Sequence, residues 1–225
     1  MPDRQAREDA LTTARVQRRL AAIMATDIVG YSRMIDADEA GTLAAIKALR
    51  TDIVDPALAG HGGRIVKLMG DGALVEFDSV VEAVVCAIDM QKGIAAHQAA
   101  RPPAQRIVFR IGINLGDVVV EGGDLFGDGV NVAARLEQLA PPGGVLISGT
   151  AYDQMKGKLS LPLDNMGEQR VKNISDPLRT YSVRMAGAPR AWKLRLRRFR
   201  RWVPAAAAAV VLLALVGAAS WWLRP

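Results

Sequence analysis

The sequence predicts an α+β fold whose first six elements follow the order β-α-β-β-α-β. Two observations indicate this order. Apolar runs of strand length alternate with longer stretches whose apolar residues recur at helical spacing, and turn signals separate the two kinds of segment. This is the order of a ferredoxin-like sheet with helices on one face. With 225 residues, half of them hydrophobic, the chain is large enough to bury a core.

The first half of the predicted domain contains three strands and one helical stretch. Residues 20–28 form an apolar run that ends at an acid, as a buried strand does. A helix is expected to begin at the Asp-x-x-Glu sequence that starts at Asp36 and to run toward Leu58. Residues 64–69 and 73–77 flank a Gly-Asp-Gly turn, which predicts a hairpin.

The second half is expected to begin with a helix capped by Ser79. Glu82 follows three residues later, which completes a capping box, and apolar residues then recur at helical spacing. Beyond it the sequence predicts strands at residues 107–114, 117–121, 145–148 and 178–183 and a helix at 130–139. The domain is therefore expected to extend past the sixth element with additional C-terminal strands.

Residues 203–223 are free of charge and have the length that a helix needs to cross a bilayer. Tryptophans stand at both ends of the stretch, as in helices that span a membrane. Seven basic residues lie at positions 190–201 and only Arg224 follows, so the positive-inside rule predicts a single-pass protein of the inner membrane with residues 1–202 in the cytoplasm. The alternative is a buried, alanine-rich core helix.

The net charge of +6 is concentrated at the C-terminal end. Residues 187–225 contain eight basic and no acidic side chains, which leaves residues 1–186 with a formal charge of −2. The basic stretch 187–202 is therefore interpreted as a juxtamembrane linker that contacts anionic lipid, and nucleic acid is not an expected partner. The predicted domains are a charged N-terminal segment (1–19), a catalytic domain (20–186), this linker and the transmembrane helix (203–223).

Cysteine and histidine usage limits the chemistry. The single cysteine, Cys86, lies in an apolar run and is interpreted as a buried small hydrophobic residue. His61 and His97 are far apart in the sequence and give no pattern typical of transition-metal ligands. Any metal is therefore expected to be a hard cation bound by oxygen.

Two acidic residues are candidates for such a site. Asp27 closes the first predicted strand, and Asp71 lies in the turn of the predicted hairpin. In a β-α-β-β arrangement the first strand can lie beside this hairpin, which brings the two carboxylates together. Paired carboxylates of this kind suit Mg²⁺ or Mn²⁺. Taken singly, each aspartate is more often an ordinary turn residue.

Three segments in this order and spacing closely resemble the signature motifs of class III nucleotidyl cyclases. They are Thr26-Asp-Ile-Val-Gly-Tyr-Ser32, Lys67-Leu-Met-Gly-Asp-Gly72 and Asp124-Leu-Phe-Gly-Asp-Gly-Val-Asn131-Val-Ala-Ala-Arg135-Leu136. The resemblance covers residues 20–185. It is closest to the bacterial adenylate cyclase type, which also has Gly-Glu-Gln-Arg-Val-Lys-Asn-Ile before its last strand, here residues 167–174.

The resemblance implies a site with two metal ions. Asp27 and Asp71 would hold two Mg²⁺ or Mn²⁺ ions per active site, and the Ile28 carbonyl would add a ligand. The backbone N–H groups of the turn that contains Gly30, Tyr31 and Ser32 could cradle the β- and γ-phosphates of the nucleotide.

The resemblance also assigns residues to the rest of the nucleotide. Arg135 would stabilise charge at the α-phosphate, Asn131 would position the ribose, and Lys172 would bind the terminal phosphates. Asn131 and Arg135 are four residues apart and share one face of a helix. A simpler interpretation makes Arg135 a surface partner of Glu137 or Asp124, but it leaves the asparagine unexplained.

Lys67 and Asp124 are the candidates for base recognition. A lysine can donate to adenine N1 and a carboxylate can accept from the N6 amino group, whereas guanine presents a donor at N1 and an acceptor at O6. Lysine and aspartate are also the residue types that adenylate cyclases have at the matching positions. The sequence therefore predicts that ATP is preferred to GTP.

In the family the metal aspartates come from one subunit and the remaining residues from the other. This chain has both sets, so the resemblance implies a homodimer with two equivalent shared sites. The predicted function is a membrane-anchored adenylate cyclase that converts ATP to cyclic AMP and pyrophosphate. Alternatives are a guanylate or mixed-specificity cyclase, a catalytically silent nucleotide-binding or dimerisation module, and a polymerase-type palm, which would not account for Asn131 and Arg135.

Overall fold

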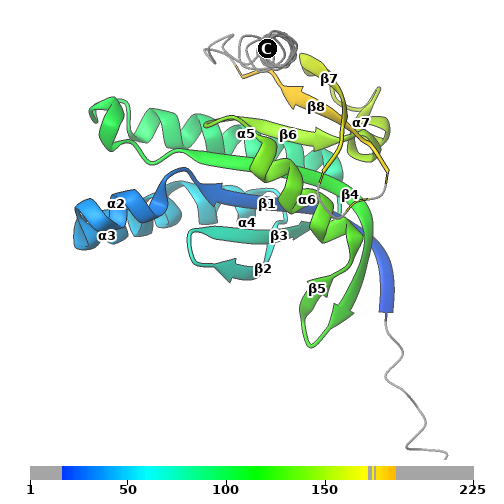
Figure 1. Ribbon diagram of the computed structural model, residues 1–225, viewed down its shortest axis with the longest axis horizontal. Helices are drawn as coiled ribbons and strands as arrows, with labels where there is room; N and C mark the ends of the chain where they lie inside the picture. The colour runs from blue at the N-terminus through cyan, green and yellow to red at the C-terminus, as the bar shows by residue number, and fades with distance from the viewer. Residues whose placement is uncertain (1–16, 172–173, 175, 186–225) are drawn as a thin grey trace, which may run out of the picture. The chain divides into compact units, whose positions relative to one another are not determined.

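The computed structural model describes residues 17–171, 174 and 176–185 (Figure 1). Within these residues the chain forms one eight-stranded sheet in the order β2-β3-β1-β4-β6-β8-β7, and the short β5 pairs with β4. The strands are β1 (Gln17–Ile28), β2 (Arg64–Met69), β3 (Gly72–Phe77), β4 (Phe109–Glu121), β5 (Asp124–Phe126), β6 (Val145–Ser148), β7 (Leu163–Gln169) and β8 (Leu178–Val183). β1 is antiparallel to both of its neighbours, β3 and β4, and β4 is parallel to β6.

Helices fill the connections between strands. They are α2 (Tyr31–Ala37), α3 (Glu39–Leu49), the π-helical turn η1 (Arg50–Val54), α4 (Asp55–Gly60), α5 (Val80–His97), the 3₁₀ turn η2 (Pro103–Gln105), α6 (Asp128–Leu139) and α7 (Gly149–Met155). The predicted β-α-β-β-α-β order of the first six elements is confirmed, with α2, α3, η1 and α4 together as the first helical stretch.

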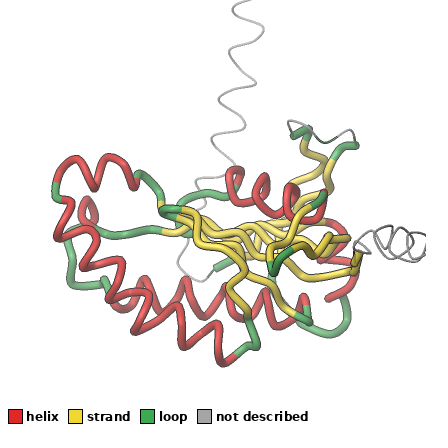
Figure 2. Tube along the Cα trace, turned by 90° about the horizontal axis from the view of Figure 1, so that it is seen from below, coloured by secondary structure: helices red, strands yellow, loops and turns green. Residues whose placement is uncertain are grey.

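The helices of the first six elements share one face of the sheet, as predicted, and the later helix α6 covers the opposite face (Figure 2). Successive residues of a strand point to opposite faces. In β1, Ala22 and Met24 belong to the core shared with α5, whereas Ala21 and Ile23 belong to a second, smaller core that includes Ala133 of α6. The helix α6 therefore packs on the face opposite α5.

The helix starts were predicted with mixed success. Asp36 begins no helix, because α2 has already started at Tyr31. The residue that caps α3 is Asp38, whose side chain accepts from the N–H of Gly41. Ser79 does cap α5, accepting from the N–H of Glu82 at 3.4 Å, as predicted.

Three features of the strands and helices differ from the prediction. The segments expected at 107–114 and 117–121 are one continuous strand, β4, because it pairs with β1 along the whole length from Gln17 to Ile28. The edge strand β7 and the short helix α7 were not predicted.

Cys86, a residue of α5, is fully buried in the core, which confirms the interpretation of this residue as a small hydrophobic side chain. Burial raises the pKa of its thiol to about 12. The thiolate that reacts with electrophiles and metals is therefore suppressed at physiological pH.

The predicted transmembrane and juxtamembrane segments, residues 187–223, lie outside the described residues, as does most of the segment 1–19. Among the described residues, no helix combines the length and the apolar character that a membrane crossing requires.

Histidine ion pairs join the helices of the first connection to α5. The ring of His61, which follows α4, lies with Nδ1 2.8 Å from Glu82 and Nε2 3.3 Å from Asp89, both on α5. Only the protonated imidazole can donate from both nitrogens. His97, at the end of α5, approaches Asp52 of η1 at 3.3 Å. The pKa of His61 is raised, mainly by the hydrogen bond to Glu82.

Because the pKa of His61 is raised on folding, its pairs stabilise the protein below about pH 6.5, the ordinary histidine value, and this contribution is lost as pH rises through the folded-state pKa. We expect His61→Gln to lower the free energy of unfolding of the full chain by about 1 kcal/mol at pH 6 and to have little effect at pH 9. Urea denaturation at both pH values measures this. His97→Gln, which removes a histidine with one carboxylate partner, is the matched control, and an equal loss at both pH values would contradict the assignment to His61.

Candidate active site

Asp27 and Asp71 meet at one end of the sheet, as the sequence predicted. The turn between β2 and β3 lies directly against the end of β1: a Cβ added at Gly72 would come within 2.4 Å of the Thr26 carbonyl oxygen. The N–H of Ala73 donates to Thr26 Oγ1 at 3.2 Å, which fastens the hairpin to β1. The pKa of Asp71 is raised, first by burial and further by the adjacent Asp27 carboxylate.

Arg110 and Glu137 complete this cluster and were not predicted. Arg110 is the residue of β4 directly opposite Asp27 of β1, and its guanidinium donates to the Asp27 carboxylate. The Nε atom of Arg110 lies 3.2 Å from Oε1 of Glu137, which belongs to α6. Burial, followed by the charge of Asp27, raises the pKa of Glu137 to about 7. The sequence signal for Arg110 is a charged residue inside the otherwise apolar strand segment at 107–114.

The charges of the cluster fit a hard divalent cation. Three carboxylates, those of Asp27, Asp71 and Glu137, share the positive charge of one guanidinium, so negative charge is in excess when they are ionised. Within the described residues, no group of three or more acidic, histidine or cysteine side chains is arranged to hold a metal alone. Mg²⁺ commonly takes one or two carboxylates and completes its shell with water and phosphate oxygens. The Ile28 side chain is buried in the core, and the role of its carbonyl stays a prediction.

The predicted phosphate-binding turn follows β1. Gly30 adopts a φ of 73°, a left-handed conformation that favours glycine, and precedes α2, in which Tyr31 and Ser32 are the first residues. The N–H of Val29 is already donated to the Val108 carbonyl. The Arg33 guanidinium lies beside Gly30, because a Cβ added there would be 3.4 Å from its Nη2 atom. Arg33 is thus a cation at this turn that was not predicted.

Glycines allow α6 to lie directly on β4. A Cβ added at Gly112 would approach the Glu137 nitrogen at 2.2 Å and the Ala133 carbonyl oxygen at 2.3 Å. A Cβ at Gly116 would lie 3.1 Å from Cα of Gly129, at the start of the same helix. These glycines form a seam, hereafter the glycine seam, that fixes which face of α6 meets the sheet.

The glycine seam separates two sets of residues on α6. Glu137 faces the sheet and contacts Arg110. Arg135 precedes it by two residues, which is about 200° around the helix, and Asn131 lies within about 40° of Arg135. Asn131 is exposed, and Arg135 donates to Gln138 at 2.8 Å. The two residues therefore share a face, as predicted, and it is turned away from the Asp27 cluster of their own chain.

Lys67 and Asp124, the predicted base-recognition residues, lie together. Lys67 is in β2 at a register shift opposite β3, and Asp124 begins β5. The Lys67 Nζ atom is 3.3 Å from Asp124 Oδ2, and both side chains are exposed. Asp124 is thus paired with Lys67 and Glu137 with Arg110, whereas Arg135 donates to Gln138. The simpler interpretation of Arg135 as a partner of Asp124 or Glu137 is therefore wrong. Lys172 lies outside the described residues.

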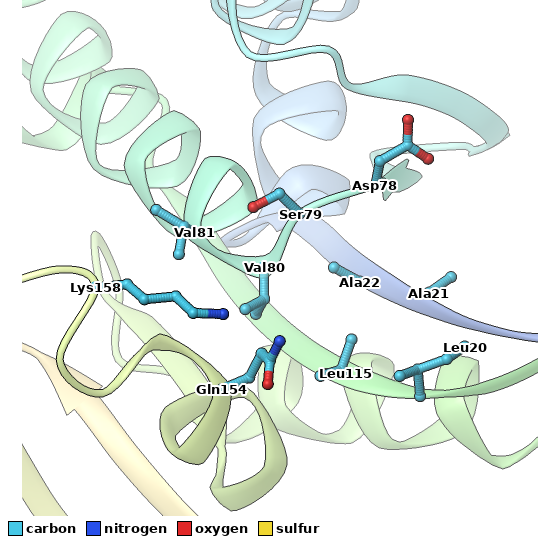
Figure 3. A pocket seen from close by; sticks show the side chains of 10 residues that line it. All are labelled: Leu20, Ala21, Ala22, Asp78, Ser79, Val80, Val81, Leu115, Gln154 and Lys158. Carbon is cyan, nitrogen blue, oxygen red and sulfur yellow. The ribbon is translucent and has the colours of Figure 1, made fainter.

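A separate hollow lies beside the first half of β1, between the start of α5 and α7 (Figure 3). Its lining includes Leu20, Val80 and Leu115 together with the polar side chains of Gln154 and Lys158. None of the predicted site residues that the structure describes lines it.

The chain belongs to the family described as the adenylate and guanylate cyclase catalytic domain, whose model matches residues 16–185. It is 46% identical over 167 residues to “Putative adenylate cyclase 3” of Rhizobium meliloti (strain 1021), an alignment that covers 74% of this chain and 28% of that protein. It is 36% identical over 140 residues to an adenylate cyclase of Streptomyces coelicolor, covering 61% of this chain and 34% of that protein. The chain thus spans about a third or less of the length of these relatives.

Solved structures of cyclases share the fold. The adenylate/guanylate cyclase/hydrolase from Silicibacter pomeroyi has a TM-score of 0.71 and 43% identity, and the match covers 75% of this chain and 98% of that chain. The adenylyl cyclase CyaB from P. aeruginosa has a TM-score of 0.67 at 23% identity, covering 78% of this chain and 97% of that chain. The mixed α+β architecture is therefore that of a cyclase catalytic domain.

The glycine seam predicts a large cost for any side chain at position 112. We expect Gly112→Ala to lower the free energy of unfolding by about 2–3 kcal/mol or more, because the new methyl group meets helix backbone that cannot rotate away. Urea denaturation of the full chain measures the loss. Gly60→Ala is the matched control: a Cβ there meets nothing within 4 Å, so we expect no loss. Equal stability of the two variants would contradict the seam.

Proposed function

We propose that this chain is the catalytic part of a homodimeric adenylate cyclase that converts ATP to 3′,5′-cyclic AMP and pyrophosphate. The observation that carries the proposal is the meeting of the Asp27 and Asp71 carboxylates at the end of β1. Membership of the cyclase family and the named adenylate cyclases among its relatives support it.

The reaction is an in-line attack of the ribose 3′-oxygen on the α-phosphorus. When bound, two Mg²⁺ or Mn²⁺ ions would lower the pKa of the 3′-hydroxyl and neutralise the triphosphate. Asp27 and Asp71 would hold the ions, and the turn at Gly30, Tyr31 and Ser32 would bind phosphate oxygens. In this proposal Arg135 stabilises the negative charge that develops at the α-phosphate, as preorganised cations do in phosphoryl transfer.

The other residues position the nucleotide. Asn131 would orient the ribose and Lys172 the terminal phosphates. The contact between Lys67 and Asp124, at 3.3 Å, supports a joint role in reading the base, because a donor and an acceptor side by side match N1 and N6 of adenine. Guanine would place a donor against the lysine and an acceptor against the carboxylate, so we propose a preference for ATP.

The active sites are proposed to lie between two subunits. The face of α6 that holds Asn131 and Arg135 is turned away from Asp27 and Asp71 of the same chain, which supports a role for these residues in the site of another chain. Exposed apolar side chains near Lys67 and Asp124, those of Leu68, Met69 and Phe126, are suitable for a subunit contact. A two-fold dimer would then contain two equivalent sites.

The full chain with Mn²⁺ is expected to form cyclic AMP from ATP and to discriminate against GTP when both are supplied. Asp27→Asn is expected to reduce the rate by at least a hundredfold, because it removes a carboxylate from the metal site. Chromatography of the products with ATP and GTP in competition measures both effects. Equal use of GTP would favour the mixed-specificity alternative, and no product from either nucleotide would favour the silent module.

Mixing two inactive variants tests the sharing of sites. Asp27→Asn and Arg135→Ala chains, co-expressed with different tags and purified through both, form a heterodimer with one intact site. We expect about half of the activity of a wild-type dimer, whereas each variant alone stays inactive. Failure of the doubly tagged heterodimer to regain activity would contradict sharing.

Attachment to the inner membrane through residues 203–223, with the catalytic domain in the cytoplasm, is also part of the proposal. The uncharged length of this stretch, its flanking tryptophans and the basic residues before it support it. We expect the full chain to stay with bacterial membranes after an alkaline carbonate wash and a chain without residues 203–225 to be released. Release of both chains would contradict the anchor.

A further inference from the structure

The ion pair between Arg110 and Glu137 has no role in the chemistry described so far, although it adjoins the predicted metal site. We propose that Glu137 is a positioning residue: it keeps the Arg110 guanidinium paired when Asp27 gives up this arginine to bind a divalent cation. The proposal rests on the metal site of the proposed function and extends it to the residues that set the affinity for the ion.

Arg110 lies between two carboxylates that come from different elements. It donates to Asp27 across the β1–β4 pairing, and its Nε atom faces Glu137 at 3.2 Å. The side chains of Arg110 and Asp27 are 27% and 20% exposed, and that of Glu137 is 10% exposed. The Arg110 guanidinium is thus largely removed from water, and its positive charge is compensated by these two carboxylates.

Glu137 cannot move away from this position easily. The glycine seam holds the backbone of α6 on β4, and a Cβ at Gly112 would lie 2.2 Å from the Glu137 nitrogen itself. Gly112 is two residues from Arg110 on the same face of the strand. The glycine seam therefore fixes how far Glu137 lies from the Arg110 guanidinium. Glu137 is therefore a fixed carboxylate, whereas Asp27 lies at the end of β1, beside the Asp71 turn.

The Asp27 carboxylate has two competing cationic partners, Arg110 and a metal ion. An arginine does not lose its proton in a protein, so release from Asp27 would leave a buried positive charge. Such an unpaired charge is costly. Because Glu137 remains beside the guanidinium, the Asp27 carboxylate can leave Arg110 and bind the ion without leaving the arginine unpaired. The negative charge of Glu137 also favours a cation nearby.

A purely structural role is the alternative. If the pair only joined α6 to β4, loss of either partner would lower stability and would leave metal affinity unchanged or lower it in both variants. A positioning role predicts effects of opposite sign. Without Glu137 the arginine binds Asp27 more firmly and metal binding weakens, and without Arg110 the competitor is gone and metal binding strengthens.

The test measures binding of Mn²⁺ alone, without nucleotide, to the detergent-solubilised full chain, from the electron paramagnetic resonance signal of the free ion. We expect E137Q to weaken binding on the order of tenfold and R110Q to strengthen it several-fold. The double variant should return close to the wild-type value, because the two removed charges are opposite. D128N is the matched control, since it removes an exposed carboxylate from the first turn of the same helix and is expected to change little.

Two outcomes separate this inference from the proposed function. If D27N binds Mn²⁺ as tightly as the wild type, the metal site itself is wrong. If D27N abolishes binding but E137Q and R110Q both weaken it, or neither changes it, only the role of Glu137 is overturned. Circular dichroism checks folding. If E137Q does not fold, R110Q against the charge-retaining R110K still decides, since only R110Q should strengthen binding.

Discussion

The arrangement of the site depends on the close contact between α6 and β4. Gly112 and Gly116 have no side chains where the helix crosses the strand, so at these two positions backbone packs against backbone. This contact decides the rotation of α6 about its own axis. Glu137 is thereby turned inward against Arg110, and Asn131 and Arg135 are turned outward. One packing contact thus places some residues of a single helix beside the Asp27 cluster of their own chain and turns others away from it.

The residues that lie on strands or in their turns could be predicted from the sequence. Asp27 and Asp71 were expected to meet because the β-α-β-β order places the first strand beside the hairpin, and β1 does pair with β3. Ser79 was recognisable because a cap is a local signal, read from a few neighbouring residues. In these cases the information lies in residues close in sequence or in the order of elements.

Features that depend on tertiary packing could not be predicted in the same way. The side of the sheet covered by α6 follows from glycines on a distant strand, and the roles of Arg110 and Glu137 follow from that side. The edge strand β7 escaped prediction because its residues alternate little in burial and contain few apolar side chains, as is tolerable at an edge with one neighbour, β8. Asp36 was mistaken for a helix start because Asp38, two residues later, offers the same chemistry.

The charge distribution within the domain differs from that of the whole chain. The basic charge of the sequence lies near its C-terminal end, whereas the end of the sheet that holds Asp27 and Asp71 has several carboxylates around a single arginine. Clustered carboxylates repel one another, so a nearby positive charge stabilises their ionised forms. In the described structure Arg110 supplies such a charge from within the chain. Arg110 is also paired with a second carboxylate, that of Glu137, and in the proposal above this second pair is what allows Asp27 to exchange the arginine for an ion of higher charge.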